Sequence, residues 1–173
     1  MRARRPRLNP ALYVGLQRCF LTFCTAGRRR HFAASDIVDL VIDQLLRTAD
    51  EFDVEVTVYC FMPDHAHLLV ETRSEGADIL QFVHRAKQRS GFEFAKEYGT
   101  RLWQPSFYDR VLRDDEASLS VARYIIENPE RAGLVHSPHD YPFLGSTMYT
   151  IGQILEAVCW QPTARANDVL GQP

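Results

Sequence analysis

The chain has 173 residues, a length that fits one ordinary domain and argues against a multidomain assembly. Its 46% hydrophobic and 24% charged residues are typical of a globular protein with enough apolar material for a core. No run approaches the roughly 18 apolar residues of a membrane span, and the basic start lacks the apolar stretch of a secretory signal. Four cysteines without a Cys-x-x-Cys pair favour reduced thiols in a cytoplasmic protein with no membrane partner.

The net charge of −2 conceals an uneven distribution of charged residues. Residues 1–30 hold eight arginines and no acid, whereas the rest of the chain carries a balance of −10. A basic block at one end suits the binding of phosphates, so we interpret residues 1–15 as a basic N-terminal arm. A solvated tail explains this charge equally well.

The first half of the chain predicts a strand, a helix and a hairpin, in that order. Residues 18–25 are rich in aromatic and β-branched side chains and predict a strand. Apolar residues then follow helical spacing over residues 35–48. Residues 54–61 alternate with period two, and a Met-Pro-Asp turn separates them from a second strand at residues 65–71. These two strands should pair as a hairpin.

The next segment predicts a long helix followed by an extended stretch. Over residues 78–98, the apolar face of the helix is distinct from a stripe formed by Arg85, Arg89 and Lys96. Residues 102–113 return to an extended, aromatic-rich pattern. The stripe places three cations on one side of the helix, which makes it a candidate surface for phosphates.

The last part of the chain predicts a third helix, over residues 114–128, that ends before Pro129. A short helix at residues 151–159 should follow. Strand, helix, hairpin, helix, strand and helix together indicate the α+β class, as a ferredoxin-like or RRM-like sandwich with a mostly antiparallel sheet and helices on one face. We expect one domain over residues 16–147 and a C-terminal extension over residues 148–173.

A His-x-His pair marks the first candidate site. On a strand, His65 and His67 point to the same face, where two imidazoles could share one divalent ion. Two ordinary half-buried histidines would give the same spacing. Glu71 lies on that face too and would complete a cupin-like pattern, but cupins are all-β barrels and three helices are predicted here. We therefore expect Glu71 to be a solvated strand end.

The second candidate site lies on the third predicted helix, where Tyr124 and Asn128 are four residues apart on one face. A tyrosine hydroxyl, with a pKa of about 10, is a poor nucleophile unless a metal withdraws charge from a bound phosphodiester. An asparagine oxygen beside two imidazoles suits Mg²⁺ or Mn²⁺. Core packing of Tyr124 and a helix-capping role for Asn128 fit these residues equally well.

Three separated segments resemble one known family. They read His65-Ala-His67-Leu-Leu-Val, Leu102-Trp-Gln-Pro-Ser-Phe-Tyr-Asp-Arg-Val-Leu-Arg113 and Tyr124-Ile-Ile-Glu-Asn-Pro-Glu-Arg-Ala-Gly-Leu-Val135. In this order they resemble the single-tyrosine HUH transposases, and most closely the REP-associated tyrosine transposases. The resemblance covers about residues 10–147.

The resemblance implies an enzyme that cleaves and rejoins single-stranded DNA, as a nickase and strand transferase. It implies that His65, His67 and Asn128 hold Mg²⁺ or Mn²⁺. It further implies that Tyr124 attacks a phosphodiester, which gives a 5′-phosphotyrosine and a free 3′-hydroxyl. A DNA-hairpin-binding protein that descends from such an enzyme and no longer cuts is the alternative.

Resemblance and charge together indicate single-stranded hairpins of REP-like palindromes as partners, in a nucleoid-associated protein that is a monomer or a homodimer. Trp103, Phe107 and Tyr108 could stack unpaired bases, and we expect two of these three to lie in the core. Tyr108 is also a competing nucleophile, although it lacks an amide four residues on. The candidate DNA-binding residues are Arg4, Arg5, Arg7, Arg28, Arg29, Arg30, Arg85, Arg89, Lys96 and Trp103.

Overall fold

The computed structural model describes residues 10–160 except the side chain of Glu116. Five strands form one antiparallel sheet in the order β4-β1-β3-β2-β5. The strands are β1 (Arg18–Cys24), β2 (Val54–Met62), β3 (His65–Thr72), β4 (Tyr108–Leu112) and β5 (Leu144–Gly145). The predicted hairpin is β2 and β3, which pair directly. The predicted α+β class is confirmed.

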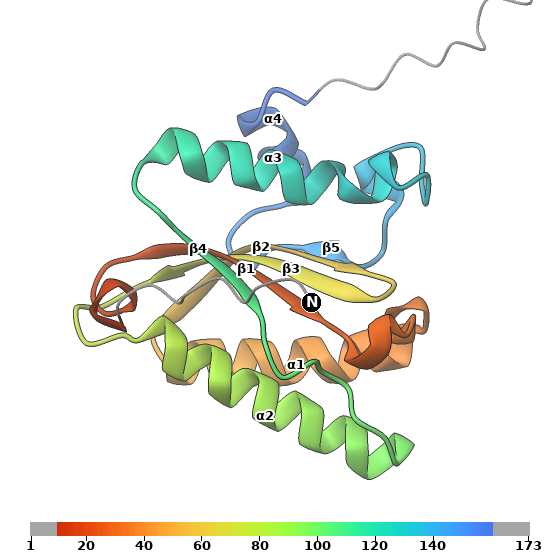
Figure 1. The fold of residues 1–173 in the computed structure, drawn as a ribbon. Coiled ribbons are helices and arrows are strands. Elements are labelled where there is room, and N and C mark those ends of the chain that lie inside the picture. The colour runs from red at the N-terminus through yellow and green to blue at the C-terminus, as the bar shows by residue number, and fades with distance from the viewer. Residues whose placement is uncertain (1–9, 161–173) are drawn as a thin grey trace, which may run out of the picture.

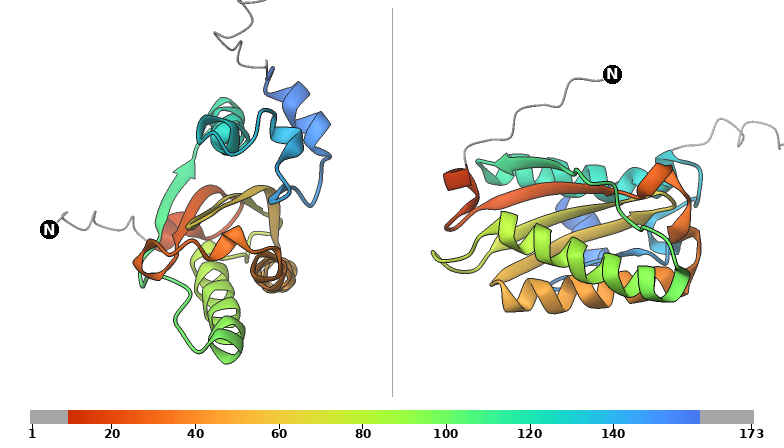
Figure 2. Two further views of the ribbon diagram at one scale, coloured as in Figure 1. Left: turned by 90° about the vertical axis from the view of Figure 1, so that its right-hand side faces the viewer. Right: turned by 60° about the horizontal axis from the view of Figure 1, so that its bottom comes forward.

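Two pairs of helices cover the two faces of this sheet (Figure 1). Helices α1 (Ser35–Glu51) and α2 (Ile79–Tyr98) lie on one face, and α3 (Asp115–Arg131) and α4 (Ile151–Ala157) lie on the other. The order β1-α1-β2-β3-α2-β4 is the ferredoxin-like unit that the sequence predicts. An end-on view shows the sheet between its two helical layers (Figure 2).

The expectation that helices would cover only one face of the sheet is therefore wrong. The reason lies in the central strands, where both faces are apolar. Strand β3 is buried at almost every position, unlike a strand with one solvated face. Val58 and Leu69, for example, face away from α1 and α2 and are buried in a second cluster with Ile125 of α3. Exposure of such an apolar surface to water is unfavourable, so the helices that follow β4 pack over it.

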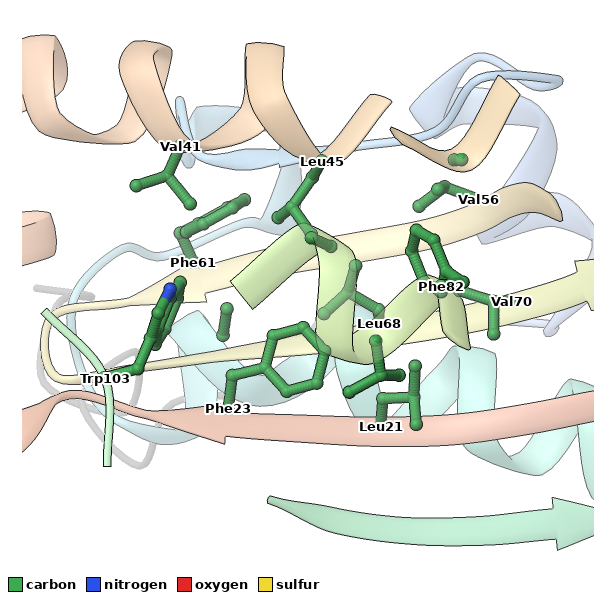
Figure 3. Close-up of a cluster of buried hydrophobic side chains, with 14 of the residues drawn as sticks. Leu21, Phe23, Val41, Leu45, Val56, Phe61, Leu68, Val70, Phe82 and Trp103 are labelled. Carbon is green, nitrogen blue, oxygen red and sulfur yellow. The ribbon is translucent and has the colours of Figure 1, made fainter. Parts of the chain in front are cut away.

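The larger apolar cluster lies between the sheet and helices α1 and α2 (Figure 3). Phe23 of β1, Val41 of α1 and Phe82 of α2 are fully buried there. The second cluster lies between the sheet and helices α3 and α4, and Ile154 of α4 is part of it. The described part of the predicted C-terminal extension therefore packs on the domain.

The N-terminal boundary also differs from the prediction. Residues Pro10–Tyr13 form a 3-10 turn, and the ring of Tyr13 is fully buried in the larger cluster. The Tyr13 hydroxyl donates a hydrogen bond to Asp109 of β4. Residues 10–15 thus belong to the folded domain, whereas Arg4, Arg5 and Arg7 lie outside the described residues. No helix within residues 10–160 is long and apolar enough to cross a bilayer.

Helix α3 begins as predicted but extends further. Asp114 caps its first turn, where the carboxylate accepts a hydrogen bond from the Ala117 amide at 2.7 Å. The helix continues through Pro129 to Arg131, so the prediction that it ends before Pro129 is wrong. The proline lies in the final turn, where its missing N–H removes only one backbone hydrogen bond. The Asn128 side chain adds one by donating to the Tyr124 carbonyl at 2.8 Å.

Candidate active site

The two histidines converge at the start of β3, on the face covered by α3. Their register sets His67 opposite Thr22 and His65 opposite Cys24 of β1. The Nε2 atoms of His65 and His67 are 3.1 Å apart, and the rings meet nearly edge to face. His67 is only 4% exposed. The period-two prediction that both imidazoles share one face is therefore correct.

The other ring nitrogens of the pair have partners of their own. His65 Nδ1 is 2.6 Å from Oδ1 of Asp64, and His67 Nδ1 is 2.9 Å from the hydroxyl of Thr22. A carboxylate only accepts, so His65 donates from Nδ1, and in its neutral form it presents a lone pair at Nε2. When His67 donates its Nδ1–H to Thr22, both Nε2 lone pairs are free for a shared cation.

The spacing and charge of the pair fit a divalent metal. Neighbouring ligands of an octahedral ion at about 2.1 Å are about 3.0 Å apart, close to the observed Nε2 separation. Burial, followed by the charges of His65 and Arg28, lowers the pKa of His67 to about 3. The His67 imidazole is therefore neutral at pH 7, as a metal ligand must be. Among the described residues, no group of three or more His, Cys, Asp or Glu side chains is arranged to hold a metal.

Helix α3 brings Tyr124 beside this pair. The Tyr124 ring centroid is 5.5 Å from that of His67 and 5.8 Å from that of Phe20 on β1. Tyr124 is 38% exposed, whereas its neighbours Ile125 and Ile126 are fully buried under α3. The core-packing interpretation of Tyr124 is therefore wrong, because the two isoleucines fill that role.

Asn128 lies one turn after Tyr124 on the same helix face. Its Nδ2 donates to the Tyr124 carbonyl, while its side-chain oxygen makes no hydrogen bond to any residue between 10 and 160. Asn128 is inside the helix and does not cap one. An uncharged oxygen donor without a partner is suited to be the third ligand of a hard cation.

Residues 16–128 match the profile of the IS200-like transposases, a span that includes both histidines, Tyr124 and Asn128 and more than half of the chain. The chain belongs to this family. This membership places it among DNA-processing enzymes.

Individual relatives agree with this assignment. A Haemophilus influenzae protein, named a REP-associated tyrosine transposase, is 22% identical over 135 residues, which cover 72% of this chain and 76% of that protein. The solved structure of a REP-associated tyrosine transposase bound to a REP hairpin superposes with a TM-score of 0.69 and 20% identity, over 82% of this chain and 81% of its own. A Deinococcus radiodurans transposase structure gives 0.50 and 22%, over 74% and 97%. Both structures share the fold.

Arg28 of the transposase reaches the histidine pair from the turn after β1. Its Nε lies 2.8 Å from Oδ2 of Asp64, the carboxylate that also holds His65. The exposed side chains of Arg29 and Arg30 follow in the same turn. This basic turn therefore lies at the candidate site, although contact between these arginines and DNA stays a prediction.

The helical stripe of cations lies elsewhere on the transposase. Helix α2 is on the opposite side of the sheet from α3 and the histidines (Figure 2). Arg89 is paired with Glu51 of α1, while Arg85 and Lys96 are exposed on α2. Any phosphates that Arg85, Arg89 and Lys96 contact are thus on a different surface from Tyr124. Helical spacing in the sequence shows which residues share a stripe, but not which face of the sheet the helix covers.

Trp103 corrects a further expectation. It is 5% exposed, and its indole N–H donates to the buried hydroxyl of Ser90 at 2.9 Å. A ring held in the core cannot offer a face to a base, so the stacking role predicted for Trp103 is wrong. Phe107 packs edge-on against Phe23 of the same core. Of the three aromatic residues, only Tyr108 faces the candidate site. Trp103 and Phe107 pack in the larger cluster, which agrees with the expectation that two of the three lie in the core.

Sequence reasoning missed three side chains around the site. Thr22 and Asp64 hold the histidine rings, and the guanidinium of Arg131 lies 5.3 Å from the Tyr124 ring centroid. Arg131 is seven residues after Tyr124, a spacing that returns to the same helix face and could have indicated it. Thr22 had no comparable signal, because only the register of β1 with β3 sets it opposite His67.

Proposed function

We propose that this transposase cleaves and rejoins single-stranded DNA through a covalent bond to Tyr124, beside Mg²⁺ or Mn²⁺ held by His65, His67 and Asn128. One observation carries the proposal: the Tyr124 ring lies 5.5 Å from His67, next to two Nε2 atoms that are 3.1 Å apart. The half-exposed ring of the proposed nucleophile thus lies beside the two proposed metal ligands, on the face of the sheet that α3 covers.

In the proposed reaction, the Tyr124 oxygen forms a bond to phosphorus while the bond between phosphorus and the 3′-oxygen breaks. The tyrosine proton is lost, and the leaving 3′-oxygen gains a proton to become a hydroxyl. A bound divalent cation supplies positive charge that offsets the charge developing on the phosphate. Helix α3 holds the Tyr124 ring beside His67, a proposed ligand of that cation, so the attack should require little reorganisation of the protein. Because the 5′-phosphotyrosine keeps the bond energy, a 3′-hydroxyl can reverse the step.

The proposed substrates are DNA hairpins with unpaired flanks. Support comes from the solved relative, which is bound to a REP hairpin, and from the basic turn beside the histidines. Short inverted palindromes next to the reading frame would supply the oligonucleotides for a test. A hairpin-binding protein that does not cut is the second candidate, since binding and cleavage use different groups.

A covalent-adduct assay separates these two candidates. The protein is incubated with a labelled hairpin oligonucleotide and Mn²⁺, then resolved on a denaturing gel. We expect an adduct that Tyr124→Phe abolishes, because the phenylalanine ring keeps the packing on Phe20 but has no nucleophile. Tyr149→Ala, at an exposed tyrosine outside the site, serves as the control and should leave the adduct intact. Tight binding of the same hairpin without any adduct would favour the non-cleaving protein.

A further inference from the structure

Phe20 is the centre of an aromatic cluster that extends past the nucleophile. Its ring centroid is 5.4 Å from that of His67, 5.8 Å from that of Tyr124 and 5.9 Å from that of Tyr108. Tyr108 begins the edge strand β4 and meets Phe20 edge-on. It is 43% exposed, so much of its ring is open to solvent beside the candidate site.

The alternation of β4 places Tyr108 and Arg110 on the same face as the histidines. Asp109 accepts a hydrogen bond from Tyr13 in the opposite cluster, and Val111 packs against that cluster. Side chains alternate along a strand, so the residues on either side of Asp109 point the other way. In register, Tyr108 stands opposite Thr22, which in turn stands opposite His67. Tyr108 is two strands, or about 10 Å, from His67.

Arg110 carries an exposed guanidinium two residues after Tyr108 on β4. It makes no ion pair with any described side chain, whereas Arg18, at the far end of β1, is paired with both Glu71 and Asp115. An open aromatic ring next to an open guanidinium is the combination that binds unpaired nucleotides, through base stacking and a phosphate contact.

We propose that Tyr108 and Arg110 form a subsite for an unpaired nucleotide next to the phosphodiester at Tyr124, with the base on the Tyr108 ring and a phosphate on Arg110. This inference rests on the proposed function. The subsite is continuous with the candidate site through Phe20, whose ring contacts both Tyr108 and Tyr124. Its distance of about 10 Å from His67 suits a nucleotide close to the scissile phosphodiester in an extended DNA strand. The ligand is single-stranded DNA, because a paired base would not expose its face to the ring.

The test measures binding apart from cleavage, in a Tyr124→Phe background. A fluorescent oligothymidylate of about 12 nucleotides is the probe, and its dissociation constant is read by anisotropy. We expect Tyr108→Ala to weaken binding by about 5- to 100-fold, and Tyr108→Phe, which keeps the ring, to restore most of it. Tyr149→Ala is the matched control, since Tyr149 is 48% exposed and lies outside the cluster, and it should bind like the parent.

A salt titration tests Arg110 separately. Arg110→Gln should lower the slope of log K against log salt by about 0.7, the value for one phosphate contact on a single strand. Arg113→Gln is the control, because Arg113 is exposed just after β4 and should leave the slope unchanged. Equal slopes for these two variants would show that Arg110 acts only through overall charge and would overturn its assignment.

Unaltered binding by Tyr108→Ala would overturn the subsite. If the alanine variant does not fold, Tyr108→Leu keeps the apolar contact with Phe20 and still removes the aromatic face, so it must weaken binding in the same way. Failure of the proposed function would give another result. The parent protein, which retains Tyr124, would then form no covalent adduct, while the Tyr108 variants would still change the affinity for the oligonucleotide.

Discussion

At the scale of single residues, Asp64 has the most connected position in the site. One carboxylate oxygen holds His65 and the other holds Arg28, at 2.6 and 2.8 Å. The same side chain therefore sets the orientation of a proposed metal ligand and the place of a cation. A carboxylate behind a metal-binding histidine fixes the ring and raises its basicity.

Replacing Asp64 should weaken metal binding without changing a proposed ligand. We expect Asp64→Ala to lower Mn²⁺ affinity by about 10- to 100-fold, because His65 loses the acceptor that orients it. Asp64→Asn keeps an oxygen acceptor for Nδ1–H and should lose less. Calorimetric titration with Mn²⁺ measures both. Equal affinities of the alanine and parent proteins would contradict the role of Asp64.

Arg131 should affect the rate at which Tyr124 forms the covalent adduct. Its guanidinium lies 5.3 Å from the Tyr124 ring centroid, and a cation over an exposed aromatic ring contributes about 0.5–1 kcal/mol. We expect Arg131→Gln to slow adduct formation by about 2- to 5-fold in single-turnover assays, with Arg131→Lys in between. Arg123→Gln is the control on the same helix, because Arg123 is paired with Glu127 at 2.8 Å. A control as slow as Arg131→Gln would assign the effect to the net charge of α3.

At the scale of elements, α3 is both part of the fold and the carrier of the nucleophile. Its buried face packs on the sheet through Ile125 and Ile126, while the adjoining face presents Tyr124. The N-terminal cap of α3 lies far along the helix from that tyrosine. Stability and chemistry can therefore be changed separately in this helix.

The cap of α3 gives a prediction about stability alone. Asp114→Ala removes the acceptor of the Ala117 amide and should lower the free energy of unfolding by about 1 kcal/mol. Asp114→Asn, which can still cap, should cost much less. Urea unfolding followed by circular dichroism measures the difference. Adduct formation at a temperature where both variants are folded should match the parent, and a large loss there would show that the cap also positions Tyr124.

At the scale of the whole molecule, two thiols are buried in the two cores. Burial raises the pKa of the Cys19 thiol to about 12, and burial raises the pKa of the Cys60 thiol as well. The other cysteines are more open: Cys24 is half-buried and Cys159 exposed. Thiol-specific reagents at neutral pH should therefore modify Cys159 and Cys24 well before the buried pair.

The buried thiols also predict how stability depends on pH. In the folded protein the pKa values of Cys19 and Cys60 lie above the unfolded value of about 9. The stability that these protonated thiols contribute is therefore fully present below pH 9. As the pH rises from 9 towards 12, the unfolded chain loses these protons first, and the free energy of unfolding falls by up to about 1.4 kcal/mol per pH unit for each thiol. Urea unfolding at several pH values measures this slope. The double variant Cys19→Ala/Cys60→Ala should show a shallower slope, and an identical slope would contradict the assignment.

Residue patterns were enough to predict most of the elements and which side chains share a face of each element. Period two set His65 and His67 on one face of a strand, and helical spacing set Tyr124 and Asn128 on one face of a helix. These relations depend only on the local geometry of the backbone, so a pattern of residue types is enough to predict them. The family resemblance was readable for the same reason, because its segments are local.

Which faces of these elements pack together could not be predicted in the same way, because it depends on the fold of the entire chain. That α3 covers the histidines while α2 covers the opposite face depends on burying both apolar surfaces of β3, a requirement shared among distant segments. The same packing took Trp103 into the core and left Tyr108 in solvent, although both lie in one aromatic stretch. Local periodicity carries no information about such long-range choices, because they depend on the surface that the rest of the chain leaves uncovered.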